Sequence, residues 1–269
     1  MAYDAGVDCV LPVGNIDLPD VPALIHETVF ARGTADLKRI AIFIGGSDIA
    51  AGEALLGAIQ AAFFGTMRVS VMLDSSGCNT TAAAVVAKIL STGPVAGKRA
   101  TVLAGTGPVG VRTAALLALE GAVVTLTSRW LSRAEAASAA IRERFAISVN
   151  PAQVSGAADC SHALHGAEVV VVAGAPGVTL LPQALWSVHP TLQTLVDVNA
   201  VPPLGIEGIV PTLDGEQREG RVIFGALGVG ALKKRTHYAC LARLFERNDQ
   251  VFDAEQISGI AKELSGGSP

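Results

Sequence analysis

Hydrophobic residues in positions 1–95 alternate between strand-like and helical patterns. Each short apolar run is followed by a turn and then by a longer Ala-rich stretch. Such alternation favours a parallel sheet covered by helices. A connector that contains glycine and proline, STGPVAGK at residues 91–98, predicts the boundary to a second domain. The elements expected in this region are strands at residues 39–44 and 67–73 and helices at residues 50–64 and 80–90.

A second alternation of the same kind begins at Arg99. The unbroken run Val169–Val172 is typical of a strand that is buried on both faces. After Gly230 the pattern becomes helical again, at residues 232–245 and 254–264. The expected fold is therefore α/β with two domains, one at residues 96–230 and one at residues 1–95 completed by residues 231–269. The other elements expected after Arg99 are strands at residues 99–103, 123–127 and 194–198 and helices at residues 109–119 and 132–145.

The composition changes this picture little. A mean hydropathy of +0.46 raises the question of a membrane, but the longest uncharged stretch, Val169–Val196, is broken by glycine and proline. A spanning helix needs about 20 mostly apolar residues, so this stretch predicts a buried strand, a turn and a short helix. With a net charge of -4 and no basic stripe, nucleic-acid binding has little support. We expect a cytoplasmic protein without a signal peptide, with its four scattered cysteines reduced and buried.

A glycine-rich turn follows the strand that begins at Arg99 and opens an apolar helix. The first glycine permits a tight turn, the second lets the backbone approach a diphosphate, and the third lets helix and strand pack closely. The N–H groups at the helix start would attract the phosphates. This context predicts a Rossmann-type dinucleotide site, and the alternative is a turn of the same shape without a ligand. The run consists of Gly105, Thr106, Gly107, Pro108, Val109 and Gly110.

The end of the next strand bears on the choice of nucleotide. Enzymes that use NAD tend to carry an acid there, about 20 residues beyond the turn, whereas this chain has Ser128 and Arg129, with Arg133 close behind. A guanidinium fork suits a 2′-phosphate, so the sequence favours NADP, with NAD still possible. Arg129 could instead be a solvated loop charge.

Two further strand ends carry candidates for the nicotinamide half of the cofactor. Ala173, Gly174 and Ala175 follow the valine run and would let the ring lie close to the backbone. Asn199 ends the next strand, either as a cofactor contact or as a loop cap.

Polar loops follow both strands of the first domain, and ligands of open α/β sheets bind at such strand ends. Candidates for substrate binding are Asp48 in the first loop and Asp74, Asn79, Thr80 and Thr81 in the second, although some could be ordinary helix caps. A glycine run at residues 225–230 leads to Lys233, which we expect at a helix start, where a cation is unfavourable.

A cation placed against a helix dipole often marks a function, so Lys233 is a candidate contact for an anionic or carbonyl group of a substrate, the alternative being a solvated charge. His162 and His165 have helical spacing but no third ligand, so we expect them to face solvent and expect no metal site.

Five blocks of sequence resemble the NADP-dependent methylene-tetrahydromethanopterin dehydrogenases of methylotrophic bacteria. The resemblance is collinear over nearly the whole chain, and the first-domain blocks are more specific than the glycine-rich turn. The C-terminal segment Val251–Glu255 (VFDAE) also fits the family. The five blocks are GGSDIAAGE at residues 45–53, MLDSSGCNTTA at 72–82, VLAGTGPVG at 102–110, NAVPPLGI at 199–206 and FGALG at 224–228.

The resemblance implies hydride transfer from methylene-tetrahydromethanopterin to NADP during formaldehyde oxidation, in a homo-oligomer (a trimer or hexamer) with the pterin between the domains. It implies pterin contacts at Asn79 and Thr81, a lysine near the reacting carbon at Lys233, and a 2′-phosphate contact at Arg129. The resemblance departs at Ser128, where the family has glycine, and at Met1, which follows the point where family members have a further strand.

Three alternatives stay open. The same reaction on methylene-tetrahydrofolate uses a carrier with the same reacting ring region, and the sequence does not separate the two. A non-catalytic NADPH-binding sensor would keep the glycine-rich turn but would not need the polar block at residues 74–81. A shikimate-type dehydrogenase would need a Lys/Asp pair, which is not found.

Overall fold

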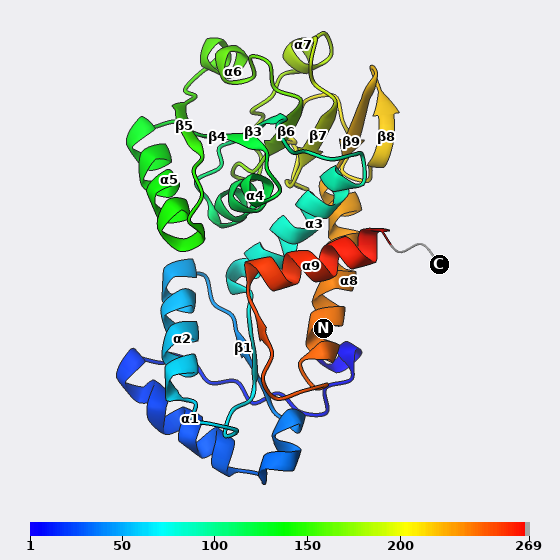
Figure 1. The fold of residues 1–269 in the computed structure, drawn as a ribbon. Helices are drawn as coiled ribbons and strands as arrows, with labels where there is room; N and C mark the ends of the chain where they lie inside the picture. Colours follow the sequence, from blue (N-terminus) through cyan, green and yellow to red (C-terminus); the bar gives the residue numbers. More distant parts are fainter. Residues whose placement is uncertain (267–269) are drawn as a thin grey trace. The chain divides into compact units, whose positions relative to one another are not determined.

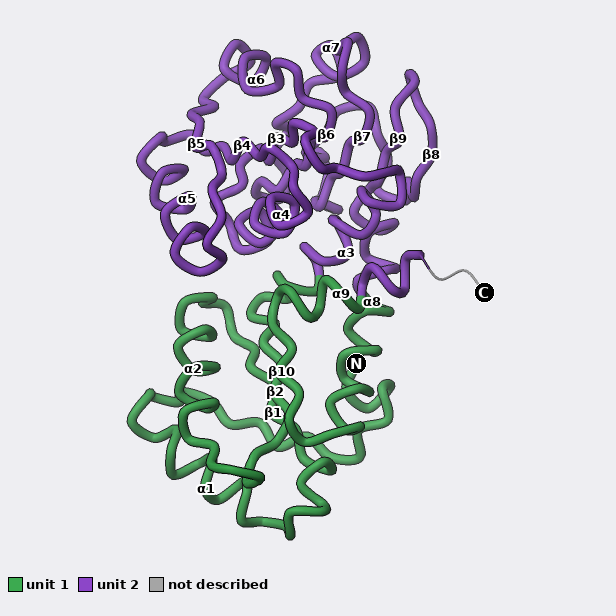
Figure 2. Tube along the Cα trace, viewed as in Figure 1, with its two compact units in different colours: residues 1–80, 234–260 green, residues 81–233, 261–269 purple. Residues whose placement is uncertain are grey.

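The computed structural model describes residues 1–266, and its chain divides into two compact units (Figure 2). Unit 1 contains residues 1–80 and 234–260, and unit 2 contains residues 81–233 and the C-terminal residues from Ala261. These limits differ from the expected boundaries at residues 95 and 230, because the division falls inside three helices rather than in connectors. Those helices are α3 (Cys78–Leu90), α8 (Ala226–Arg243) and α9 (Ala254–Gly266).

Unit 1 is built on a three-stranded parallel sheet in the order β1-β2-β10. On one face, Val71 and Leu73 of β2 pack with Ile25, Val29 and Leu56 from two helices. Met72, whose side chain points to the other face, is buried as well, so this strand is buried on both faces. The strands are β1 (Ala41–Ile44), β2 (Ser70–Leu73) and β10 (Val251–Phe252), and the helices are α1 (Val21–Phe30) and α2 (Ile49–Ala62), with short 3-10 helices at Tyr3–Ala5, Leu18–Asp20, Thr34–Arg39 and Ser75–Gly77.

Unit 2 contains a seven-stranded sheet in the order β5-β4-β3-β6-β7-β9-β8, in which only β8 runs antiparallel (Figure 1). The first six strands follow the strand order of a Rossmann fold, so the predicted α/β class is confirmed. The strands are β3 (Arg99–Leu103), β4 (Val123–Ser128), β5 (Asn150–Gln153), β6 (Val169–Val172), β7 (Thr194–Asp197), β8 (Asp214–Arg218) and β9 (Arg221–Phe224), and the helices are α4 (Pro108–Leu119), α5 (Leu131–Phe145), α6 (Ala157–Ala163) and α7 (Gln183–Trp186).

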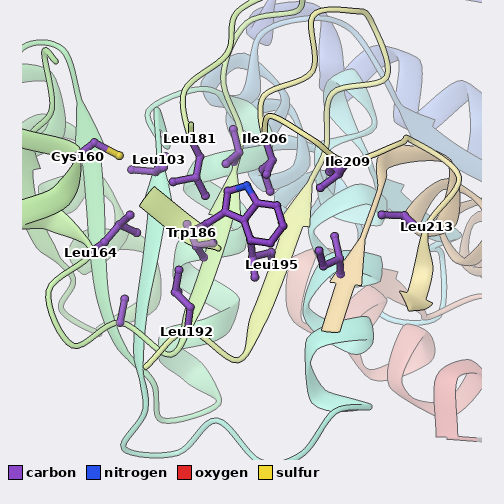
Figure 3. Packing of buried hydrophobic residues seen from close by; sticks show 14 residues of the cluster. Leu103, Cys160, Leu164, Leu181, Trp186, Leu192, Leu195, Ile206, Ile209 and Leu213 are labelled. Carbon is purple, nitrogen blue, oxygen red and sulfur yellow. The ribbon is translucent and has the colours of Figure 1, made fainter. Parts of the chain in front are cut away.

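The core of unit 2 surrounds Trp186, whose ring lies among Leu181, Leu195 and Ile206 (Figure 3). The indole N–H donates to the Glu207 carbonyl at 2.9 Å, so the one polar atom of this side chain is satisfied. Burial of the large apolar side chains on this face fixes β6 and β7 in the middle of the sheet, and with them the loops at the carboxyl ends of both strands.

Two sequence expectations fail in detail. Cys78, Cys160 and Cys240 are buried, but Cys9 is exposed, because it lies in an N-terminal segment without a covering element. Helix α8 begins at Ala226 rather than at residue 232. No helix within residues 1–266 combines the length and the apolar character that crossing a bilayer requires.

Candidate functional site

The carboxyl edge of the unit 2 sheet gathers the predicted cofactor residues. Strands β3 and β6 are neighbours, and β4 and β7 flank them on opposite sides. The chain therefore leaves β3 and β6 in opposite directions, which is the switch point where open α/β sheets bind their ligands. The structure brings together here the loops that follow these four strands.

The turn after β3 has the shape that its glycines predicted. A Cβ on Gly110 would lie 2.5 Å from the Cα and carbonyl oxygen of Gly105, so α4 packs directly on the turn. A Cβ on Gly107, by contrast, would meet nothing within 4 Å. Gly107 is also the N-cap of α4 and has no side chain to cap the helix, so N–H groups at this end remain available to an anion.

This turn contains a strained residue, Ala104, whose φ of 50° places its backbone in the left-handed region. Its N–H donates to Thr127 Oγ1 at 3.1 Å, and the N–H of Gly105 donates to the Thr127 carbonyl at 2.9 Å. A non-glycine residue in this conformation is strained, and such residues concentrate at binding sites. The strand β4 thus holds the turn in place.

Two arginines follow β4, Arg129 directly after the strand and Arg133 in the first turn of α5. Arg129 and Arg133 are exposed, and within residues 1–266 no ion pair or hydrogen bond holds either guanidinium. Arg129 and Ser128 also line a small cavity of about 30 Å³ beside the glycine-rich turn. Ser128 Oγ accepts the Trp130 N–H at 3.4 Å, so this hydroxyl stays near the loop.

The loop after β7 leaves one buried polar atom without a partner. Asn199 is 6% exposed, and its Oδ1 accepts the Val201 N–H at 3.0 Å, which is the loop cap expected as an alternative. Its Nδ2 is buried and makes no hydrogen bond within residues 1–266. Because a buried unsatisfied donor is destabilising, this atom is a candidate ligand contact.

The carboxylate of Asp197 holds the loop after β7 in place. Asp197 is fully buried and accepts the N–H groups of Asn199 and Ile206, each at 2.9 Å. Burial raises the pKa of Asp197, and these backbone hydrogen bonds oppose that effect. On the neighbouring β6, Ala173 donates its N–H to the Leu103 carbonyl at 3.0 Å, and a Cβ on Gly174 would overlap Leu180. Ala175 lies exposed at the tip of that loop.

In unit 1, the loops after β1 and β2 are bonded to each other. Ser75 Oγ donates to the Gly45 carbonyl at 3.1 Å, Ser76 N–H to Gly46 at 2.7 Å, and Ser76 Oγ to Ser47 at 3.3 Å. Ser76 has a φ of 53°, a second strained non-glycine residue. The two loops therefore form one rigid edge.

Most of the predicted pterin residues support this edge. Both amide hydrogens of Asn79, a residue with 0% exposure, are used, one by the Leu73 carbonyl at 2.7 Å and one by Asp253 Oδ1 at 3.1 Å. Asp74 accepts the N–H and the hydroxyl of Thr80, at 3.0 and 2.7 Å. In this structure Asp74, Asn79 and Thr80 hold the loop, and a direct contact between them and a pterin stays a prediction.

The remaining candidates differ in exposure. Asp48 is the exposed N-cap of α2 and accepts the Ala51 N–H at 3.0 Å, as the capping alternative predicted. Thr81 and Lys233 are half-buried, on α3 and α8. A contact of either residue with a ligand stays a prediction.

Lys233 does not oppose the dipole of α8, so that prediction is wrong. Lys233 is the eighth residue of α8, beyond its first two turns, because the glycines before it belong to the helix and its start. They permit close packing: a Cβ on Gly225 would lie 2.5 Å from the Pro211 carbonyl oxygen, and one on Gly228 would overlap the Leu213 carbonyl. The role of Lys233 at the site stays a prediction.

One residue that the sequence did not single out is His237, which is 7% exposed on α8. It is four residues beyond Lys233, and this helical spacing was the only available signal. His162 and His165 are exposed, as predicted.

Comparison with known proteins places the chain in a family. The family model "Methylene-tetrahydromethanopterin dehydrogenase, N-terminal" matches residues 1–76. The bifunctional protein MdtA of Methylorubrum extorquens is 48% identical over 98% of this chain and 93% of its own length. An NAD(P)-dependent methylenetetrahydromethanopterin dehydrogenase of the same organism is 31% identical over 99% and 93%.

Among solved structures, 5-ketofructose reductase of Gluconobacter sp. strain CHM43 covers 97% of this chain and 90% of its own, with 17% identity and a TM-score of 0.49, a likeness too low to bear on function. The two curated relatives, in contrast, span both units at substantial identity. They confirm the resemblance carried by the five sequence blocks. The chain therefore belongs to the methylene-tetrahydromethanopterin dehydrogenase family.

Proposed function

We propose that this chain is an NADP-linked dehydrogenase that takes a hydride from methylene-tetrahydromethanopterin and yields methenyl-tetrahydromethanopterin, in one-carbon (formaldehyde) oxidation. The observation that carries the proposal is the 31% identical relative, whose name states this substrate and an NAD(P) dependence, aligned over 99% of the chain. The open glycine-rich turn at the switch point of unit 2 supports it independently, since it supplies the backbone geometry that a dinucleotide needs.

The residues present fit the nicotinamide nucleotide. The open approach at Gly107 suits the diphosphate, and the exposed Arg129 and Arg133 suit a 2′-phosphate. Asn199 Nδ2, which has no hydrogen-bond partner within residues 1–266, suits a carbonyl acceptor such as the nicotinamide carboxamide. When bound, the nicotinamide ring supplies the acceptor for the hydride.

The protein has to hold the reacting carbon of the substrate in position, and it does not have to transfer a proton. Loss of hydride from a methylene carbon between two nitrogens leaves a delocalised cation, so no general base is required. Holding the reacting carbon at the right distance and angle can by itself contribute several kcal/mol, on the order of 7 or more in the best cases. We assign this orientation to Thr81 and Lys233, with Asp74 and Asn79 shaping the loop that precedes them.

A second carrier merits the same assay. The relative at 48% identity is named a bifunctional protein, and this favours testing methylene-tetrahydrofolate, which has the same reacting ring region. Comparing both carriers with both NADP and NAD separates the candidates.

We also infer a homo-oligomer, a trimer or hexamer, in the cytoplasm. Exposed apolar side chains in unit 1 support association: Leu11 is 83% exposed, Phe30 65% and Phe64 45%, and Phe64 lines a hollow of about 540 Å³. The free thiols suit a reducing compartment. Light scattering on the purified protein would give the subunit number, and a monomer at working concentration would exclude the oligomer.

The deciding experiment follows NADPH formation by purified protein given methylene-tetrahydromethanopterin and NADP. We expect saturable turnover that depends on both. Binding of NADPH without turnover on either carrier would instead favour a cofactor sensor, and absence of saturable NADP binding would overturn the proposal.

A further inference from the structure

A buried histidine faces a buried carboxylate inside unit 1. His237 Nδ1 lies 3.5 Å from Asp74 Oδ2, and the two side chains are 8% and 2% exposed. Within residues 1–266 this nitrogen has no aligned hydrogen-bond partner. An apolar side chain would fill such a position without leaving a polar atom unsatisfied, so packing alone does not explain a histidine here.

Asp74 is held in place by Thr80, which bonds to both carboxylate oxygens, including the Oδ2 that lies near His237. Its Oδ1 accepts the Thr80 N–H, and its Oδ2 accepts the Thr80 hydroxyl, so the carboxylate is fixed to the first turns of α3. The ring of Phe43 on β1 packs edge-on against the imidazole, with centroids 5.7 Å apart and planes at 69°. The histidine therefore contacts both β1 and the loop after β2.

The charge of Asp74 also acts on α8 one turn further along. The pKa of the Cys240 thiol is raised to about 12, first by burial and then by the negative charge of Asp74. His237 and Cys240 are three residues apart and therefore lie on one side of α8. The 3.5 Å approach of His237 to Asp74 on this side restrains the rotation of the helix about its own axis.

Lys233 belongs to the same stripe. The positions 233, 237 and 240 follow the spacing i, i+4, i+7, which places their side chains in one row along a helix. Any rotation of α8 at His237 would turn the Lys233 side chain by the same angle. A fixed rotation at the buried pair therefore sets the direction in which Lys233 leaves the helix.

We propose that His237, paired with Asp74, is a positioning residue that aims Lys233 at the pterin. This inference rests on the proposed function and deepens it: the loop after β2 acts on the substrate through α8. His237 itself need not touch the pterin, and its effect passes through the helix.

Two substitutions separate this role from simple packing. His237→Leu keeps an apolar body but removes Nδ1, whereas His237→Asn places an amide near the position of Nδ1. We expect His237→Leu to lower kcat/KM for the pterin about tenfold with KM for NADP unchanged, and His237→Asn to recover most of the loss. The exposed His165→Leu serves as the matched control. Equal losses in the Leu and Asn variants would overturn the pairing.

A double-mutant cycle tests whether the effect passes through Lys233. If His237 acts by aiming this lysine, adding His237→Leu to Lys233→Ala causes no further loss of kcat/KM for the pterin. Multiplying losses would mean that the two residues act separately, and the positioning role would be wrong.

A third measurement needs no turnover. Lys233 is half-buried and its neighbour Lys234 is exposed, so limited acylation followed by mass spectrometry gives each lysine a rate in the same molecule. We expect His237→Leu to change the ratio of the two rates by about threefold or more, and His237→Asn to restore it. If the ratio of the two lysine rates does not change in an active enzyme, the positioning role of His237 is wrong. If the ratio changes but the protein has no dehydrogenase activity, the positioning of Lys233 stands and the proposed function is wrong.

Discussion

The carboxyl edges of the two sheets carry the candidate site residues, and they differ in how far their polar groups are already hydrogen-bonded within the protein. At the unit 2 edge, Gly107 is open, and within residues 1–266 the Arg129 guanidinium and Asn199 Nδ2 have no partner. At the unit 1 edge, Asp74 and Asn79 already use their donors and acceptors within the protein. The unit 2 edge thus carries groups that suit an anionic ligand, whereas the polar groups of the unit 1 edge hold its own loops.

This difference follows from what each edge has to do. A dinucleotide brings charge and many acceptors, so backbone N–H groups and free cations are enough to bind it. A neutral ring that must present one carbon for hydride transfer needs precise placement, and precise placement requires that the supporting side chains be locked by hydrogen bonds of their own. The satisfied groups at the unit 1 edge supply that rigidity.

The largest expected effect is at the contact between turn and helix in unit 2. In Gly110→Ala the new Cβ would lie 2.5 Å from backbone atoms of Gly105, which cannot move without displacing α4. We expect a loss of about 3 kcal/mol or more in the free energy of unfolding, measured in urea, because overpacking against backbone cannot relax. Gly107→Ala is the matched control: nothing lies within 4 Å of its Cβ, so stability is retained while NADP affinity falls. Similar stability losses in both variants would contradict this account.

A somewhat smaller effect is expected at the unit 1 edge. Asn79→Ala removes the donors to the Leu73 carbonyl and to Asp253 in a fully buried place. Leaving these acceptors unsatisfied costs about 2 to 3 kcal/mol. The exposed cap variant Asp48→Ala is the comparison, and it should lose only about 1 kcal/mol. If Asn79→Ala retained full stability but lost pterin affinity, Asn79 would be a direct contact and the edge would not be the scaffold described above.

Cofactor choice gives the third test and concerns binding alone. Arg129→Ala removes a guanidinium that makes no hydrogen bond or ion pair within residues 1–266, so the fold should be unaffected. Charge-assisted hydrogen bonds are worth about 1.5 to 3 kcal/mol, so NADP affinity should fall about tenfold or more while NAD affinity is unchanged. Titration of both nucleotides measures this ratio. An equal loss for NAD would mean that Arg129 does not contact the 2′-phosphate.

The sequence predicted the strands and the glycine-rich turn of the unit 2 edge well, because these features belong to the local chain. Strands β3 and β6 were predicted with their observed limits, β6 as an unbroken valine run and β3 as a short, mostly apolar segment before the glycine-rich turn. The glycine-rich turn indicates a dinucleotide site wherever it lies between a strand and a helix. The missed β8–β9 hairpin shows the limit of this reasoning: β8 reads DGEQR, a polar and mostly exposed edge strand without an apolar pattern.

The unit 1 edge was predicted less well, because its properties depend on residues far apart in the sequence. Whether Asn79 faces a ligand or the core depends on Asp253, 174 positions away, which no local pattern indicates. His237 becomes a candidate only because the fold brings it close to Asp74. The start of α8 was misplaced because glycines usually interrupt helices, and only the packing against Leu213 explains Gly228 within one.

The smallest effect compares strain at the two edges. Ala104 in unit 2 and Ser76 in unit 1 both have left-handed backbones, with φ of 50° and 53°. Replacement by glycine relieves about 1 to 2 kcal/mol of strain but costs about 0.4 to 1 kcal/mol through the more flexible unfolded chain. Ala104→Gly should therefore stabilise the protein slightly, by between zero and about 1.6 kcal/mol. Ser76→Gly should gain less, because it also loses the hydrogen bond to Ser47. A larger gain at Ser76 than at Ala104, by urea unfolding, would show that the internally bonded edge is the more strained of the two.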